Sequence, residues 1–179
     1  MIDVSHLSDR AFDDVCKVAS RPFVASHSDC RALCPSLRNL TDPMIRALAD
    51  RGGVMGINLA PGFLDPEVHR RQAPLFEKSQ RPGVSEEERS QLREKAMSIR
   101  RPSLDWVARH VRHAIDVGGE DCIGLGGDLD GIGQTPEGIE SVADYRSFAP
   151  LLREAGLSES QIEKVCYRNF ARVFDEVLP

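Results

Sequence analysis

The chain has 179 residues, of which 41% are hydrophobic and 28% are charged, and its formal net charge is −5. This length suits one domain with a sizeable core, and the composition excludes a disordered or fibrous protein. Acidic and basic residues are interspersed, which argues against a nucleic-acid-binding surface. No apolar run is as long as a membrane span, no signal-peptide pattern opens the sequence, and the cysteines are odd in number. These features predict a soluble chain in a reduced compartment such as the cytoplasm.

Two short apolar runs at the start of the chain each end in a Ser-His pair. His6 closes residues 2–6 and His27 closes residues 22–27, and apolar residues recur at helical spacing over residues 8–20 between them. A crossover of this length makes the two strands parallel, so both histidines are expected at the carboxyl-terminal edge of one sheet. Two imidazoles at that edge indicate a metal site, whereas a single histidine there is more often a hydrogen-bonded structural residue.

A polar segment over residues 28–40 follows the second histidine, and we interpret it as a functional loop above the strand ends. Cys30 and Cys34 lie in this loop, near His27. A metal role for these thiols is the less favoured alternative, because they lack paired Cys-x-x-Cys spacing.

Helices and strands alternate through most of the remaining chain. The apolar runs among them are nearly continuous, which is typical of strands buried on both faces of a parallel sheet. The expected elements are a helix capped by Thr41 or Asp42, a strand over residues 54–59, a helix over residues 103–117, a strand over residues 122–127, and closing helices over residues 141–155 and 158–177.

Residues 60–101 interrupt this alternation with two Pro-Gly pairs and a charged stretch around His69, before a helix opens at Ser85. We interpret the region as a loop and helix insertion on the ligand-facing side of the sheet. It is either a lid or a solvated, mobile excursion, since loops of this length are functional or flexible.

His110 and His113 are three residues apart in the helix over residues 103–117, which is a chelating spacing. They are nevertheless predicted to be packing or surface residues, because that helix lies away from the strand ends.

Asp128 emerges where the fourth strand ends, within the glycine-rich residues 126–131. The stretch has no following Lys-Ser/Thr and no EF-hand series of acidic ligands, so it is neither a phosphate loop nor a calcium loop. An aspartate at this end of a parallel strand is better interpreted as a proton acceptor or a metal-linked carboxylate.

The alternation of strands and helices indicates an open α/β sheet or a segment of a β/α barrel. Five motifs decide between these folds: DVSH at 3–6, ASHSDCRAL at 25–33, RNLTD at 38–42, GGV at 52–54 and GGDLDG at 126–131. In this order they resemble the membrane (renal-type) dipeptidase family, peptidase family M19. The resemblance implies the C-terminal half of a metal-dependent (β/α) TIM-type barrel, with residues 1–179 as one partial domain.

The same resemblance implies zinc-dependent hydrolysis of dipeptides and, in some members, of dehydropeptides or carbapenems. By position, His6 and His27 resemble two ligands of one Zn²⁺, and Arg38 resembles the cation that receives the carboxylate of the dipeptide substrate. Asp128 resembles the acid that accepts and returns the proton of the hydrolytic water, with Asp130 as the alternative.

The family's other metal ligands, a His-x-Asp pair and a bridging Glu, belong to an amino-terminal half that this sequence does not contain. We therefore expect at most one partial site of the binuclear zinc centre here. The alternatives are an inactive fragment, an assembly partner that needs a separate amino-terminal half, and a homodimer. A hydrolase for another amide is a further alternative, because Ala60 and Pro61 fall near the substrate.

Overall fold

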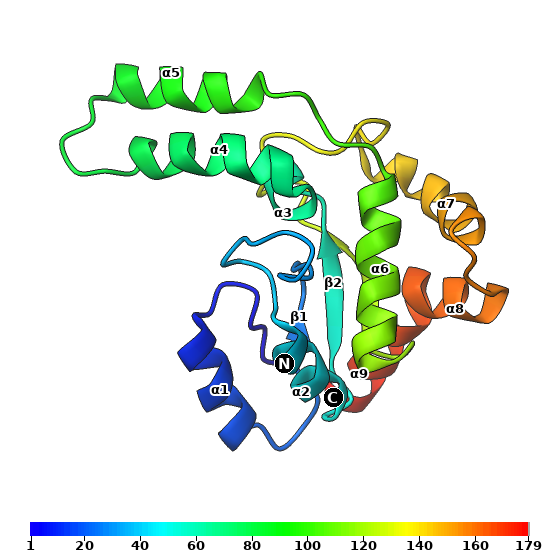
Figure 1. Ribbon diagram of the computed structural model, residues 1–179. Coiled ribbons are helices and arrows are strands. Elements are labelled where there is room, and N and C mark those ends of the chain that lie inside the picture. Colours follow the sequence, from blue (N-terminus) through cyan, green and yellow to red (C-terminus); the bar gives the residue numbers. More distant parts are fainter. Residues whose placement is uncertain (179) are drawn as a thin grey trace.

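The computed structural model describes residues 1–178 and has a parallel three-stranded sheet at its centre (Figure 1). The strands β1 (Val24–Ala25), β2 (Val54–Asn58) and β3 (Ile123–Gly127) pair in that order. Asp3 adds a parallel bridge to Val24 on the outer side of β1. The carboxyl ends of four parallel segments therefore lie along one edge, as the sequence predicts.

The first apolar run is shorter as a strand than its sequence suggests. Only the bridge at Asp3 is regular, with Val24 donating to Ile2 and Val4 donating to Val24 through their backbone groups. Among residues 1–178, β1 is the only neighbour of this segment in the sheet, so few ladder bonds define it.

Helices connect and cover the strands. They are α1 (Asp9–Val18), α2 (Asp42–Ala49), α3 (Pro61–Leu64), α4 (Pro66–Ser79), α5 (Glu86–Met97), α6 (Asp105–Gly118), α7 (Phe148–Glu154), α8 (Glu159–Glu163) and α9 (Asn169–Val177). The 3₁₀ turn η1 (Val142–Ser147) precedes α7, and the π-helical turn η2 (Lys164–Arg168) joins α8 to α9. Ser8 caps α1 and Thr41 caps α2 through their side chains, and Thr41 is one of the two caps predicted for α2. Over residues 1–178, none of the helices is both long and apolar enough to cross a membrane.

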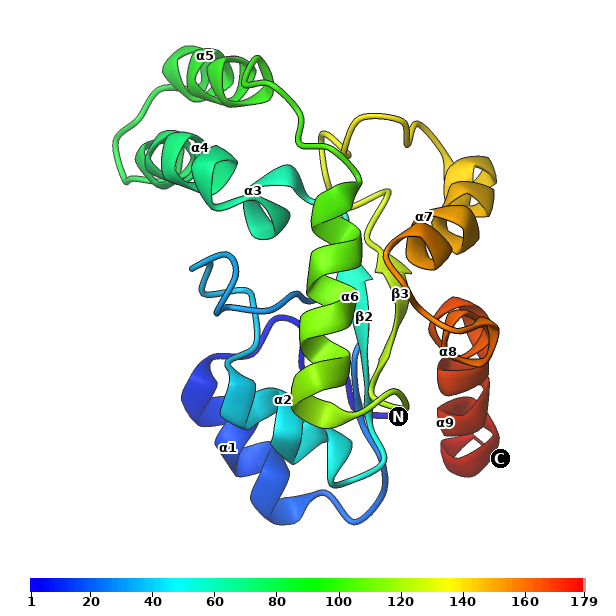
Figure 2. The ribbon, with the colours of Figure 1, turned by 45° about the vertical axis from the view of Figure 1, so that its right-hand side comes forward.

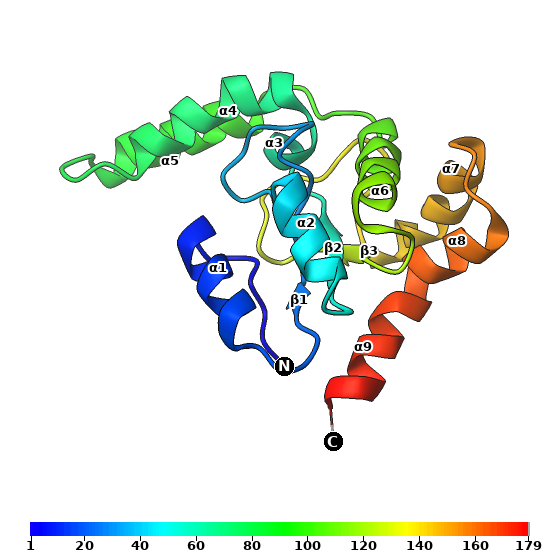
Figure 3. The ribbon, with the colours of Figure 1, turned by 60° about the horizontal axis from the view of Figure 1, so that its bottom comes forward.

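Helices lie on both faces of the sheet. Helices α1, α2 and α6 follow one another along it (Figure 3), and α6 lies in front of β2 in the view of Figure 2. The core on this side contains Ile45, Leu48, Met55, Ile57, Val107, Val111 and Ile123. On the other face, α9 packs Val173 against Val24 and Val54. The ring of Phe170 lies where a side chain at Gly124 would stand, so this glycine permits the close approach of α9.

Helices α4 and α5 form a hairpin that projects beyond the carboxyl ends of the strands (Figures 1 and 2). The sequence predicts α5, whereas α4 occupies the charged stretch around His69, for which no helix is predicted. Asp65 caps α4 by accepting from Glu67, and Pro66 opens it. Few residues of α4 are buried. The helix therefore does not need a continuous apolar stripe, which is the pattern that would have predicted it from the sequence. Whether the hairpin acts as a lid stays a prediction.

Candidate metal and substrate site

His6 and His27 meet at the carboxyl-terminal edge of the sheet, which confirms the predicted placement. His6 follows the bridge at Asp3, and His27 follows β1. Their Nε2 atoms are 3.0 Å apart. Two nitrogens bound to one tetrahedral zinc at about 2.0–2.1 Å would lie roughly 3.3 Å apart, so the pair fits two ligands of a single metal.

The neighbours of the two imidazoles also favour a cation between them. Ser26 Oγ lies 2.8 Å from His27 Nδ1 and 2.5 Å from Asp3 Oδ2, and Arg38 Nη2 lies 3.2 Å from His6 Nε2. A guanidinium only donates, and an ionised carboxylate only accepts. With neutral imidazoles these contacts leave the lone pairs of both Nε2 atoms facing each other, and a cation bound by both atoms removes that repulsion. His6 Nε2 has one lone pair, so it would then no longer accept from Arg38.

Arg38 is held beside the histidines by contacts from two segments. Its Nε donates to the carbonyl of Ser5 at 3.2 Å, and its guanidinium lies 5.5 Å from the centre of the Phe63 ring. Burial lowers the pKa of Arg38, and the carboxylates of Asp128 and Asp3 oppose this effect. The structure thus places a half-buried cation at the strand ends.

Asp128 directly follows β3, and its Oδ2 accepts from Asn58 Nδ2 at 3.3 Å. Asn58 is fully buried at the end of β2, and its Oδ1 accepts from the backbone of Ala60 at 2.6 Å. Its own backbone N–H donates to the buried Asp29, whose pKa burial raises well above the usual value. Asn58 therefore joins β2 to the candidate acid on β3, a contact that sequence reasoning missed.

The backbone at Asp128 is unusual. Its φ is 64°, and it is the only non-glycine residue of the described chain with a positive φ. The preceding Gly127 also has a positive φ, 102°, and a side chain there would collide with the hydroxyl of Tyr145. Two successive left-handed residues turn the chain sharply out of β3 and aim the carboxylate toward Asn58.

The charges at this edge act on one another. Burial lowers the pKa of His27, an effect that Asp128 and Asp3 partly offset and that His6 and Arg38 reinforce. The structure therefore brings together four predicted residues, which are His6, His27, Arg38 and Asp128.

The remaining candidates lie elsewhere. The thiols of Cys30 and Cys34 are buried, and each donates to a backbone carbonyl, of His110 and Gly62 respectively. Asp130 is exposed and lines a separate pocket. Within residues 1–178 no group of three or more His, Cys, Asp or Glu side chains could hold a metal. Within the described residues, the candidate site thus has His6 and His27 and no third side chain of these kinds that could join them on a metal.

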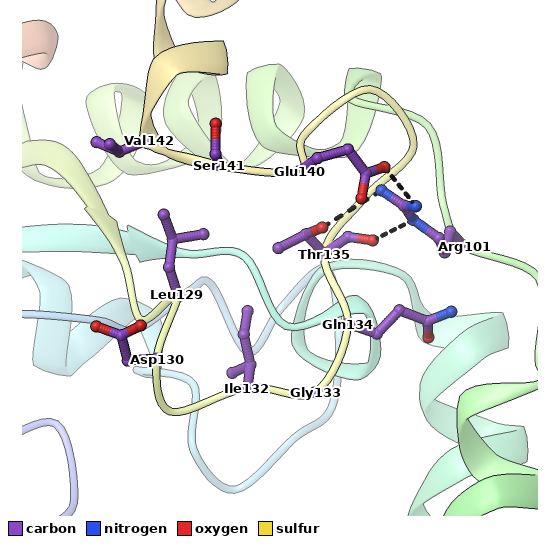
Figure 4. Close-up of a pocket in the computed structure, with 10 residues that line it drawn as sticks. All are labelled: Arg101, Leu129, Asp130, Ile132, Gly133, Gln134, Thr135, Glu140, Ser141 and Val142. Carbon is purple, nitrogen blue, oxygen red and sulfur yellow. Dashed lines mark hydrogen bonds and ion pairs between the residues drawn. The ribbon is translucent and has the colours of Figure 1, made fainter.

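A pocket of about 590 Å³ is formed by the segment that follows Asp128 in the chain, from Leu129 onward, and Asp128 itself is not in its lining (Figure 4). Arg101 closes one side, donating to the carbonyls of Thr135, Pro136 and Ile139 and pairing with Glu140 at 2.7 Å. The lining consists of Arg101, Leu129, Asp130, Ile132, Gly133, Gln134, Thr135, Glu140, Ser141 and Val142. Its wall is a mixture of aliphatic and polar side chains.

His110 holds the loop over residues 28–40 in place through a hydrogen bond with its backbone. It is fully buried in α6, accepts from the backbone of Cys30 through Nδ1 at 3.0 Å, and donates from Nε2 to the carbonyl of Leu64 at 2.9 Å. Burial lowers its pKa to about 4. His113 instead pairs with Asp42 at 2.8 Å, so both histidines have packing or surface roles, as predicted.

We expect the free energy of unfolding to fall in acid because of His110. The folded-state pKa of about 4 lies below the ordinary value of 6.5, so the unfolded chain binds the proton first. This contribution is complete above pH 6.5 and is lost as the pH falls toward 4, with an upper limit of about 3 kcal/mol. Urea unfolding across this range should show a shallower pH slope for His110→Gln than for the parent chain. Equal slopes in the two proteins would contradict the assignment.

Comparison with known proteins gives a consistent family. A sequence model of the membrane dipeptidases (peptidase family M19) matches residues 1–178. The protein in the pqqA 5′ region of Klebsiella pneumoniae, itself uncharacterised, is 35% identical over 176 residues, covering 98% of this chain and 54% of its own length. Human dipeptidase 3 is 30% identical over 177 residues, covering 99% of this chain and 30% of its own length.

Solved structures give the same picture. A metallopeptidase from Rhodobacter sphaeroides, liganded with a phosphinate mimic of the dipeptide L-Ala-D-Ala, has a TM-score of 0.77 and 30% identity, over 98% of this chain and 42% of that one. The probable dipeptidase PvdM from Pseudomonas aeruginosa has a TM-score of 0.85 and 25% identity, over 99% of this chain and 50% of that one. The chain therefore spans about half of the length of these relatives, or less.

Proposed function

The chain belongs to the membrane dipeptidase family, peptidase family M19, and we propose that it carries one half of a zinc-dependent site that hydrolyses dipeptides. The observation that carries this proposal is the convergence of His6 and His27, whose Nε2 atoms are 3.0 Å apart, beside Arg38 and Asp128. We further propose that the parallel sheet is the C-terminal half of a (β/α) barrel and that residues 60–101 are an insertion in it.

His6 and His27 would hold one Zn²⁺ through their Nε2 atoms. A bound zinc supplies a polarised water of lowered pKa and charge for the developing oxyanion. Because the described residues offer no third ligand, we propose that the remaining ligands come from outside residues 1–178. The relatives, which extend well beyond the matched segment, support this division of the site.

The other two residues would bind and orient the dipeptide. Arg38 would receive its terminal carboxylate with two parallel N–H donors, since its guanidinium is fixed by Ser5 and Phe63. Asp128 would take a proton from the attacking water and return it to the leaving amine. The pocket lined by Leu129 and Asp130, which follow Asp128 in the chain, would receive a substrate side chain. The dipeptide mimic in the Rhodobacter sphaeroides relative supports this substrate class.

The second candidate is a catalytically inactive chain that acts only in assembly. It is favoured by the two-ligand site, because catalytic zinc usually has three protein ligands. Pairing could involve a separate amino-terminal half or a second copy of this chain.

Dipeptide hydrolysis, measured by amine release with and without Zn²⁺, tests the proposal. The purified chain is assayed alone and after mixing with the amino-terminal half of a family member. Zinc-dependent, chelator-sensitive hydrolysis in either preparation supports the proposed function. Absence of hydrolysis in both, from material that is folded by circular dichroism, supports the inactive assembly partner instead.

A further inference from the structure

A chain of hydrogen bonds leads from Asp3 to the far side of the His27 ring. Asp3 Oδ2 is 2.5 Å from Ser26 Oγ, which is 2.8 Å from His27 Nδ1. Asp3 Oδ1 accepts from the backbone of Ser26 at 3.0 Å and from the hydroxyl of Ser5 at 2.8 Å. Ser5 Oγ in turn accepts from the backbone N–H of His27 at 3.0 Å. The two segments that carry the histidines are thus joined through one carboxylate.

The contacts determine where the protons lie. An ionised carboxylate has no proton, so the single hydroxyl proton of Ser26 must point to Asp3. Ser26 Oγ can then only accept at its other contacts. The hydroxyl proton of Ser5, whose Oγ is 3.3 Å from Ser26 Oγ, points to Asp3 instead. The 2.8 Å contact with His27 therefore requires a proton on Nδ1. A neutral imidazole has one N–H, so the lone pair of His27 is on Nε2, the atom 3.0 Å from His6 Nε2.

We propose that Asp3, acting through Ser26, is a positioning residue that holds His27 in the Nδ1–H tautomer and directs its Nε2 lone pair at the metal position. This inference rests on the proposed role of His27 as a metal ligand. Hydrogen bonds to the second nitrogen of a ligating histidine orient the ring and fix its tautomer, and their loss weakens metal binding. Here a serine lies between the carboxylate and the imidazole, so the polarity of one hydroxyl sets the tautomer.

The variant Asp3→Asn reverses that polarity with little change in shape. The asparagine oxygen can still accept from Ser5 and from the backbone of Ser26, while its amide group donates to Ser26 Oγ. The serine proton then points to His27 Nδ1, and the imidazole must carry its own proton on Nε2, where it blocks metal binding. Ser26→Ala removes the hydroxyl that relays the hydrogen bond from Asp3 to His27 Nδ1. In this variant the tautomer of His27 is no longer fixed.

Nitrogen-15 NMR of the metal-free full chain, under conditions where the imidazoles are neutral, distinguishes the two tautomers directly. We expect Nδ1–H for His27 in the parent chain and Nε2–H in Asp3→Asn. Zinc affinity, measured by competition with a chromogenic chelator, should fall by about 10–100-fold in Asp3→Asn. The control Asp14→Asn removes an exposed carboxylate that pairs with Lys17 and should change neither result.

The two proposals fail in different ways. An Nε2–H tautomer in the parent chain overturns the role of Asp3, even if Asp3→Asn does not fold. An unchanged tautomer, or an unchanged zinc affinity, in folded Asp3→Asn overturns it as well. Absence of zinc binding by the parent chain, with the tautomers as expected, overturns the proposed metal site while the relay itself stands.

Discussion

Replacing Asp128 by asparagine is expected to lower kcat for dipeptide hydrolysis by about 10²–10⁴-fold, the usual contribution of a positioned general acid or base. Asparagine keeps the size of the side chain and tolerates the left-handed backbone, φ 64°, at this position. It can also keep the contact with Asn58 by presenting its oxygen. Since the change removes the proton acceptor without removing the binding groups, KM should change little.

The matched control for this prediction is Asp130→Asn. It makes the same chemical change two residues later, at an exposed carboxylate that lines the pocket. Steady-state kinetics of both variants, in whichever preparation hydrolyses dipeptides, assign the proton carrier. A large loss of kcat in Asp130→Asn with near-parental Asp128→Asn would reverse the two roles.

Arg38→Lys is expected to lower kcat/KM for dipeptides by about 100-fold, since charge-assisted hydrogen bonds contribute roughly 1.5–3 kcal/mol each. Lysine keeps the positive charge but cannot offer two parallel donors, and it loses the planar contact with Phe63. The expected effect is confined to substrates with a free carboxylate. A dipeptide whose carboxyl group is amidated should be hydrolysed slowly, and equally slowly, by the parent and the variant.

A control for this substitution exists in the same loop. Arg31 pairs with Asp9 at 2.7 Å and bonds to the carbonyl of Asn39, so Arg31→Lys perturbs the loop without touching the site. Its kcat/KM should remain near the parental value. Equal losses on free and amidated dipeptides in Arg38→Lys would show that Arg38 stabilises the loop and does not bind the carboxylate.

Much of this fold could be predicted from local patterns. The apolar runs at β1, β2 and β3, the caps at Ser8 and Thr41, and the two strand-end histidines are visible in the sequence and occur in the structure. Parallel topology then brings the histidines together without further information. The catalytic and binding roles of the site residues stay predictions.

Other features depend on tertiary contacts that no local pattern encodes. Asn58 looks like the polar last residue of a strand, and only the register of β2 with β3 brings it to Asp128. Asp3 and Ser26 lie inside short apolar runs, and their relay needs the pairing of two segments. Helix α4 lacks an apolar stripe because it projects in a hairpin with α5. In each case the contact with another segment of the chain, and not the local sequence pattern, determines the structural role.

Because residues 127 and 128 form a left-handed turn, stability favours glycine at position 128, whereas the proposed proton transfer needs aspartate there. A non-glycine residue held at φ 64° raises the energy of the native state, by roughly 1–3 kcal/mol in comparable cases. A search for stabilising substitutions would therefore select glycine at Asp128 and would remove the proposed proton carrier at the same step.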